Sequence, residues 1–246
     1  MDLSELSILV VVPARGGSKR IPKKNIIDIH GQPMIFWPLQ ELSMLFTPQQ
    51  VLVSTDSYEI KSLVESTGLQ VPFVRPKNLS DDFVGTLEVV EHALNWFEQH
   101  IEKVQYVITV YPTAVLLNAE DIKNALKLLL DDEKCASVMS STSFPFPIQR
   151  AFYENENGYA EMFASENYVK RSQDLQPAFH DAGQFYVSRV EAIRCKRSLI
   201  DSNVRSYYLS RNNVIDIDTF EDLQIAKELL KLRYPTANDC NTFWNF

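Results

Sequence analysis

The chain contains few cysteines and no long apolar run. Among its 246 residues there are three cysteines, Cys135, Cys195 and Cys240, which are odd in number and far apart. This spacing argues against a disulfide framework and a structural zinc site, and it is typical of the reducing cytoplasm. No apolar run approaches the length of a membrane-spanning helix, and residues 1–7 are too short and acidic for a signal peptide. We therefore predict a cytoplasmic protein that does not bind a membrane.

Positive charge is also in the minority. The 24 lysines and arginines are outnumbered by 32 acidic residues, which gives a formal net charge of −8. We do not expect such a chain to bind nucleic acid. Two common phosphate-binding patterns, G-x-x-x-x-G-K-[ST] and G-x-G-x-x-G, are missing. Apolar residues make up 45% of the sequence, which is ample for the core of one large α/β domain, with or without a small lobe.

The most informative stretch is a buried strand followed by a cationic loop. Residues 8–12 are all apolar and predict a strand buried on both faces. The loop that follows holds Gly16, Gly17 and Ser18 and the cations Arg15, Lys19, Lys23 and Lys24. Glycines let backbone N–H groups approach a ligand, and a cationic rim suits a polyanion such as a triphosphate. Taken alone, Gly-Gly-Ser-Lys is also compatible with a basic surface turn that only joins two elements.

Strands and helices alternate along most of the chain. The pattern predicts strands at 8–12, 51–54, 71–74, 104–111, 136–140, 184–188 and 214–217, and helices at 34–46, 56–67, 87–100, 118–129 and 219–230. We expect Asp56, Asn118 and Thr219 to cap three of these helices. Alternation of this kind predicts an α/β fold: a mostly parallel twisted sheet with helices on both faces. Ligands of such sheets bind beyond the carboxyl ends of the strands.

The alternation fails between residues 144 and 180, where prolines, aromatic and polar residues crowd together. We predict a small inserted lobe with short strands there. The chain then divides into a nucleotide-binding part at 1–143, the lobe at 144–180, the completion of the α/β domain at 181–234, and a tail at 235–246. Three aromatic residues of the tail, Phe243, Trp244 and Phe246, are candidates to dock elsewhere on the protein.

An acidic pair near the end of the chain is the candidate metal site. Asp216 and Asp218 flank Ile217 on the last predicted strand, so both carboxylates should project on one side while Ile217 points into the core. Two carboxylates at the ligand edge of a sheet suit Mg²⁺, which also takes phosphate ligands. Alternatively, Asp218 or Thr219 simply caps the following helix. The cationic loop elsewhere in the chain favours the metal.

The string Pro13-Ala14-Arg15-Gly16-Gly17-Ser18-Lys19, followed by Lys24-Asn25, resembles the signature of the acylneuraminate cytidylyltransferases, the CMP-sialic acid synthetases and their relatives. The resemblance implies a Rossmann-related fold of the nucleotide-diphospho-sugar transferase type. It implies that Arg15, Lys19 and Lys24 act on the phosphates of CTP, and that Asp216 and Asp218 hold Mg²⁺. The implied nucleotide contacts are Arg15, Gly16, Gly17, Ser18, Lys19, Lys24, Asn25, Arg75, Asp82 and Thr86, with Asp81 as a neighbouring candidate. Seen alone, Arg75 is equally compatible with a solvated surface arginine.

Three later strings concern the second substrate. Tyr111-Pro112-Thr113-Ala114 lies where sialic-acid synthetases usually carry Gln-Pro-Thr-Ser-Pro, and the change from glutamine to tyrosine implies a different sugar. The strings at 171–175 and 180–186 resemble the pseudaminic acid branch of the family. Arg171 is suited to bind a sugar carboxylate bidentately. The other predicted sugar contacts are Tyr111, Gln173, His180, Asp181 and Gln184, which offer donors and acceptors for hydroxyl and acetamido groups. Seen alone, His180 is an ordinary, partly exposed histidine.

The resemblance implies that CTP and pseudaminic acid, a nine-carbon α-keto acid sugar, give CMP-pseudaminic acid and pyrophosphate. It also implies a homodimer in which the lobe of one subunit reaches toward the site of the other. N-acetylneuraminic and legionaminic acid remain alternative sugars. A nucleotide-binding module without catalysis is the distant alternative.

Overall fold

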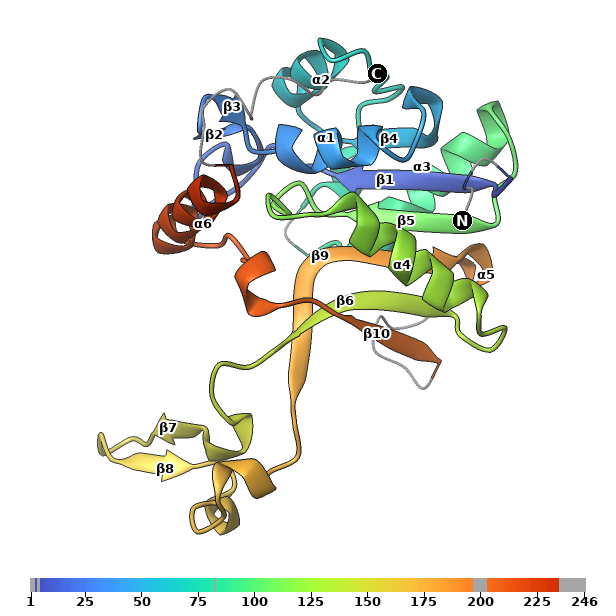
Figure 1. Ribbon diagram of the computed structural model, residues 1–246. Helices are drawn as coiled ribbons and strands as arrows, with labels where there is room; N and C mark the ends of the chain where they lie inside the picture. The colour runs from blue at the N-terminus through green and yellow to red at the C-terminus, as the bar shows by residue number, and fades with distance from the viewer. Residues whose placement is uncertain (1–2, 4, 82, 197–202, 235–246) are drawn as a thin grey trace.

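A computed structural model describes residues 3, 5–81, 83–196 and 203–234. Its centre is a six-stranded sheet in the order β10-β6-β9-β5-β1-β4 (Figure 1). The strands are β1 (Ile8–Pro13), β4 (Val51–Ser54), β5 (Tyr106–Val110), β6 (Ser137–Ser143), β9 (Phe179–Arg189) and β10 (Val204–Tyr208). Strand β9 is antiparallel to both of its neighbours, and the other pairs are parallel. The predicted α/β class with a mostly parallel sheet is confirmed.

Helices cover both faces of the sheet. The helices are α1 (Phe36–Ser43), α2 (Tyr58–Glu65), α3 (Thr86–His100), α4 (Ala119–Leu130), α5 (Val190–Arg194) and α6 (Phe220–Arg233). Alternate side chains of β1 explain the two layers. Val10 and Val12 belong to the core that holds α1, α2 and α4, whereas Leu9 and Val11 belong to the core that holds α3 and α5. A strand buried on both faces is therefore apolar at every position.

A third, separate core joins the two ends of the chain. It contains Ile21 from the cationic loop, Ile29 from the small hairpin of β2 (Asp28–Ile29) and β3 (Gln32–Pro33), and Trp37. These residues pack against Ile217 and the inner face of α6, including Leu223, Ala226 and Leu230. Figure 1 shows α6 beside β2 and β3. This core fixes the cationic loop next to the segment that carries the acidic pair.

Residues 144–178 extend away from the sheet on the continuations of β6 and β9 (Figure 1). They contain the antiparallel hairpin of β7 (Phe152–Glu154) and β8 (Ala160–Met162), together with short 3-10 turns. Many of the large apolar side chains here are exposed: Phe146, Ile148, Phe152, Tyr153, Tyr159, Phe163, Tyr168 and Val169. The predicted boundaries of this lobe stay a prediction, and the tail at 235–246 lies outside the described residues.

Some predicted elements are wrong. Residues 71–74 form no strand, because Pro72 and Pro76 cannot donate to a ladder. Residues 214–217 pair with no strand of the described chain, and the carbonyl of Ile217 accepts from the Lys24 ammonium. The prediction missed β10, a polar edge strand. Helix α1 begins at Phe36, which places Pro38 in the first turn, where no backbone donor is needed.

Two of the three predicted caps are present. Asn118 and Thr219 accept backbone N–H groups at the starts of α4 and α6. Helix α2 is capped by Ser57 and not by Asp56. Within the described ranges, the search for a helix long and apolar enough to cross a membrane finds no candidate.

Candidate functional site

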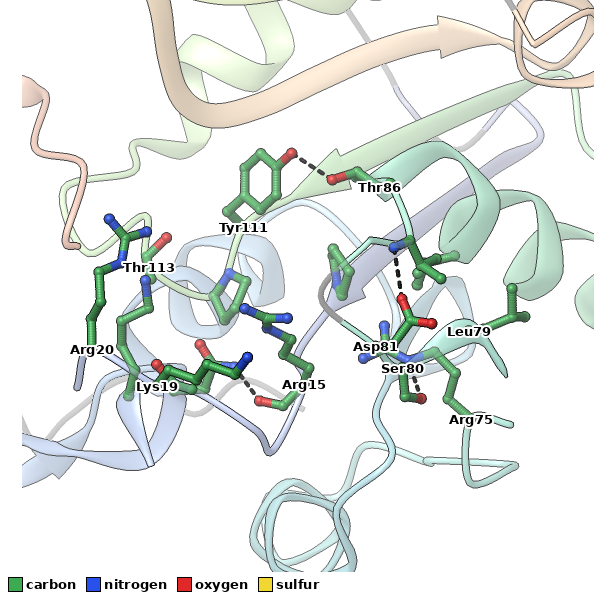
Figure 2. Close-up of a pocket in the computed structure, with 18 residues that line it drawn as sticks. Arg15, Lys19, Arg20, Arg75, Leu79, Ser80, Asp81, Thr86, Tyr111 and Thr113 are labelled. Atoms are coloured by element: carbon green, nitrogen blue, oxygen red, sulfur yellow. Dashed lines mark hydrogen bonds between the residues drawn. The ribbon is translucent and has the colours of Figure 1, made fainter. Parts of the chain in front are cut away.

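A pocket of about 510 Å³ lies at the carboxyl ends of β1 and β5. It is lined by Pro13, Arg15, Ser18, Lys19, Arg20, Lys24, Asn25, Arg75, Leu79, Ser80, Asp81, Val84, Gly85, Thr86, Val89, Tyr111, Pro112 and Thr113. In Figure 2 the side chains of the cationic loop form one wall, and Arg75, Ser80 and Asp81 form the opposite wall. The structure thus gathers most of the predicted nucleotide contacts around one cavity. Asp82 lies outside the described residues.

The cationic loop is held in shape by internal contacts. Asn25 is buried, and its side-chain amide donates to the carbonyl of Arg15 at 2.8 Å. The N–H of Gly16 donates to the carboxylate of Asp56 at 2.8 Å. A Cβ at Gly16 would lie 2.8 Å from the Cβ of Ser57, so only glycine fits this close approach. Neither Gly16 nor Gly17 lines the pocket, and a Cβ at Gly17 would meet nothing within 4 Å.

Arg75 is not a solvated surface residue. It is 5% exposed, and its backbone N–H donates to the carbonyl of Thr55 at 2.7 Å. Its guanidinium lies 3.7 Å from the carboxylate of Asp56. Burial lowers the pKa of Arg75, the Asp56 carboxylate opposes that shift, and the nearby Arg15 charge adds to it. Two like charges, Arg15 and Arg75, therefore face the same pocket, an arrangement suited to a polyanionic ligand.

Asp81 stabilises the segment that forms the opposite wall of the pocket. Its carboxylate accepts the backbone N–H groups of Phe83 and Val84 at 2.9 and 3.0 Å. The contacts hold the segment that leads into α3, at whose first position Thr86 lines the pocket. Thr86 and Tyr111 share a hydrogen bond of 2.7 Å between their hydroxyls (Figure 2).

The acidic pair meets the cationic loop at the edge of the pocket. Lys24 donates to the carbonyl of Ile217 at 2.7 Å and to the carboxylate of Asp218 at 3.2 Å, and Arg20 lies 2.8 Å from the same carboxylate. Because Thr219 is the helix cap, the Asp218 carboxylate has no capping role. Burial, and next the charge of Asp218, raise the pKa of Asp216. Ile217 points into the third core, as predicted, and the projection of both carboxylates to one side stays a prediction.

Polar groups of β5 and β9 continue the site beyond Tyr111. The Tyr111 ring packs edge-on against Tyr186 at 5.9 Å. The Tyr186 hydroxyl donates to the carboxylate of Asp181, which also accepts the N–H of Gly183 at 2.8 Å. Gly183 has a φ of +61°, and a Cβ at this position would lie 3.7 Å from the side chain of Asp216. Contacts thus run from Thr86, at the pocket, through Tyr111 and Tyr186 to Asp181.

The other predicted sugar residues lie elsewhere. Gln184 is buried, and its amide donates to the carbonyl of Asn213. His180 is exposed, with its ring 4.8 Å from that of Phe144. Arg171 and Gln173 are exposed on the lobe, where Arg171 pairs with Asp174 at 2.8 Å. The structure of one chain therefore does not bring Arg171 and Gln173 to the pocket, whose lining lies in the sheet domain.

Sequence reasoning missed several residues of the site. Arg20 stands in the cationic string and could have been included on charge alone. Tyr186 lies inside a string that carries the family resemblance. The sequence predicts Asp56 as a helix cap at the ligand edge of the sheet, but it does not predict the contacts with Gly16 and Arg75, which join segments far apart in the sequence.

Comparison with known proteins agrees with this geometry. Residues 9–235 match the cytidylyltransferase family. The chain is 39% identical over 229 residues to the pseudaminic acid cytidylyltransferase of Campylobacter jejuni subsp. jejuni serotype O:2, covering 93% of this chain and 98% of that protein. It is 26% identical to the CMP-N,N'-diacetyllegionaminic acid synthase of Legionella pneumophila, covering 92% and 97%.

A solved structure shares the fold. The CMP:2-keto-3-deoxy-manno-octonic acid synthetase, complexed with CTP, superposes with a TM-score of 0.66 at 17% identity, covering 92% of this chain and 99% of that one. With the match of the family over nearly the whole chain, we conclude that the chain belongs to the cytidylyltransferase family.

Proposed function

We propose that this protein joins CTP and pseudaminic acid to give CMP-pseudaminic acid and pyrophosphate. The observation that carries the proposal is the meeting of the cationic loop and the acidic pair at one pocket. It occurs in a chain 39% identical over 93% of its length to a pseudaminic acid cytidylyltransferase. The intact acidic pair and Lys19 argue against a nucleotide-binding module without catalysis.

Charge neutralisation and positioning are the work of the protein in this reaction. The anomeric oxygen of the sugar attacks the α-phosphorus of CTP, and the bond from that phosphorus to the bridging oxygen breaks. Pyrophosphate leaves, and the proton of the attacking hydroxyl passes to solvent. Arg15, Lys19 and Lys24 neutralise the triphosphate from the loop wall, with Ser18 and Asn25 in support. Arg75 and Thr86 hold the nucleotide from the opposite wall.

We propose Mg²⁺ as the metal of the site. Asp216 and Asp218 place two carboxylates two residues apart, and burial together with the charge of Asp218 raises the pKa of Asp216, which supports a cation at this pair. In the described part of the chain, no three His, Cys, Asp or Glu side chains are placed to share a metal. A two-carboxylate site completed by phosphate oxygens is the arrangement that Mg²⁺ favours. When bound, the ion would supply charge stabilisation on the phosphate oxygens.

The sugar end of the site is shared between two chains in this proposal. Tyr111, Asp181 and the backbone around Gly183 form the part that one chain supplies. Arg171, Gln173 and His180 are exposed and lie on or beside the lobe. We propose a homodimer in which the lobe at 144–180 of one subunit brings Arg171 to the pocket of the other. The exposed aromatic residues of the lobe supply the surface for this contact.

Complementation between two inactive variants tests the shared site. If Arg171 acts in the partner's pocket, mixing Arg171→Ala with Asp218→Ala creates heterodimers with one unimpaired site, and about a quarter of all sites regain activity. Mixing each variant with itself is the control. If the mixture stays as inactive as its components, although subunits demonstrably exchange, Arg171 does not act across a dimer.

Pyrophosphate release with CTP and Mg²⁺ tests the reaction itself. Pseudaminic, legionaminic and N-acetylneuraminic acid are offered in turn, and we expect pseudaminic acid to give the highest kcat/KM. A preference for another acid would replace the sugar in the proposal. A thermal shift with CTP but no pyrophosphate with any acid would support the binding module instead. We also propose a cytoplasmic location, with which the free cysteines Cys135 and Cys195 agree.

A further inference from the structure

Asp56 touches both walls of the nucleotide pocket without lining it. It follows β4, and its carboxylate oxygen Oδ1 accepts the N–H of Gly16 at 2.8 Å. The same oxygen lies 3.7 Å from the guanidinium of Arg75. Gly16 belongs to the cationic loop and Arg75 to the opposite wall, so a single carboxylate contacts both walls from behind.

The Arg75 guanidinium needs such a partner. Its side chain is 4% exposed, and a buried charge is costly unless it is paired. Arg15 faces the same pocket and repels it. The Nε–H group of Arg75 also donates to the hydroxyl of Ser80 at 3.4 Å. Asp56 is therefore an anionic partner that offsets the cost of burying the Arg75 charge and helps to hold its guanidinium beside the pocket.

The loop contact is equally specific. Gly16 approaches the turn after β4 so closely that a Cβ would lie 2.8 Å from that of Ser57. The backbone N–H of Ala14 donates a hydrogen bond to the carbonyl of Ser54, which continues the pairing of β1 and β4 up to this turn. Beyond it, the carboxylate of Asp56 holds the next turn of the loop, from which Arg15, Ser18 and Lys19 reach the pocket.

We propose that Asp56 is a positioning residue for CTP: it fixes the cationic loop through Gly16 and the opposite wall through Arg75, so that both walls are in place before the nucleotide arrives. This inference rests on the proposed function for the identity of the nucleotide. A negative charge near a triphosphate site would ordinarily weaken binding. A positioning role predicts instead that removing the Asp56 charge weakens CTP binding, because the cations that hold the phosphates are then misplaced.

Calorimetric titration of CTP into the full-length protein, without sugar, tests the sign. Asp56→Asn keeps an acceptor for the Gly16 N–H but loses the charge next to Arg75, and we expect CTP binding to weaken about tenfold. Asp56→Ala loses both contacts and should weaken it roughly a hundredfold. Tighter binding by Asp56→Asn would mean that the carboxylate acts only as a repelling charge, and would overturn the proposal.

Two further variants separate positioning from general damage. Asp132→Asn removes a carboxylate that pairs with Arg205 away from the pocket, so it should leave CTP affinity unchanged. A double-mutant cycle with Arg75→Ala tests the path: the effect of Asp56→Asn should nearly vanish once Arg75 is absent. An undiminished effect would overturn the link to Arg75. If Asp56 variants fold poorly by thermal unfolding, Gly16→Ala tests the loop contact alone and should also weaken CTP binding.

The outcome is distinguishable from a failure of the proposed function. CTP binding is measured in the absence of sugar and turnover, so the inference stands even if the preferred sugar is not pseudaminic acid. If the wild-type protein does not bind CTP at all, the proposed function fails first.

Discussion

The proposed nucleotide pocket and the projecting lobe differ in how many buried groups hold them within one chain. The pocket is enclosed by segments that are each held by buried groups, such as Asn25, Arg75 and the third core around Ile21 and Ile217. The lobe has a two-stranded hairpin in which every residue of β7 is exposed. An isolated hairpin is at best marginally stable in water, and its exposed aromatic side chains are not covered within the described part of this chain. In the proposed function, one chain supplies the nucleotide half of the site, and a second chain covers the lobe that completes the other half.

We expect the largest effect, a loss of turnover, from a substitution in the acidic pair at the pocket. Asp218→Ala should lower turnover by on the order of 10²-fold or more, because the carboxylate that contacts Lys24 and Arg20 is lost and the proposed metal loses a ligand. Steady-state pyrophosphate release over a series of Mg²⁺ concentrations measures it. Glu228→Ala, on the exposed face of α6, is the matched control and should keep full activity. Wild-type turnover in Asp218→Ala would remove the metal role.

The second prediction tests whether the third core holds the pocket together. Ile217→Ala removes buried methyl groups between the cationic loop and α6 and should lower the free energy of unfolding by about 2–4 kcal/mol. Ile225→Ala makes the same change on the outer side of α6, where the side chain is 44% exposed, and should cost less than about 0.5 kcal/mol. Urea unfolding measures both. Equal costs would show that the third core is not a stabilising unit.

These contrasts also show what the sequence alone could reveal. The buried run at 8–12 predicts a central strand because a strand covered on both faces is apolar throughout. The capping patterns at Asn118 and Thr219 are local and were predicted correctly. The edge strand β10 was missed because its sequence, Val-Arg-Ser-Tyr-Tyr, carries polar residues on an uncovered side.

The site was less accessible to sequence reasoning than the fold. The cationic string and the acidic pair could be recognised, since each is contiguous. Their contact depends on Ile21 and Ile217, which come from opposite ends of the chain and meet only in the folded protein. Asp56 stands where a helix cap is expected, but Ser57 takes that role and leaves the carboxylate for Gly16 and Arg75. Residue patterns within a dozen positions do not contain such long-range partners.

The third prediction concerns the lobe. Phe152 is 65% exposed on β7 in the single chain. If a second chain covers this face, Phe152→Ser should weaken dimerisation about tenfold or more, because it removes a buried aromatic anchor. Sedimentation velocity over a range of protein concentrations measures the dissociation constant. Tyr58→Ser, on the exposed side of α2, is the control. A chain that is monomeric before any substitution, or a dimer unaffected by the change, would contradict the shared site.

The smallest expected effect is a gain in stability at the acidic pair. Burial and the charge of Asp218 raise the pKa of Asp216, so the folded state holds this carboxylate less favourably than the unfolded chain does at neutral pH. Asp216→Asn removes that cost and should raise the melting temperature by about 1–2 °C at pH 7 in metal-free buffer, although turnover falls. A protonated Asp216 carries no such cost, so the stability difference should shrink as the pH falls through the raised pKa and vanish below 3.8, the usual value. Glu228→Gln should leave the melting temperature unchanged both at pH 7 and below pH 3.8. A lower melting temperature for Asp216→Asn would mean that Lys24 and Arg20 already stabilise the ionised pair without a metal, and the case for a bound cation would weaken accordingly.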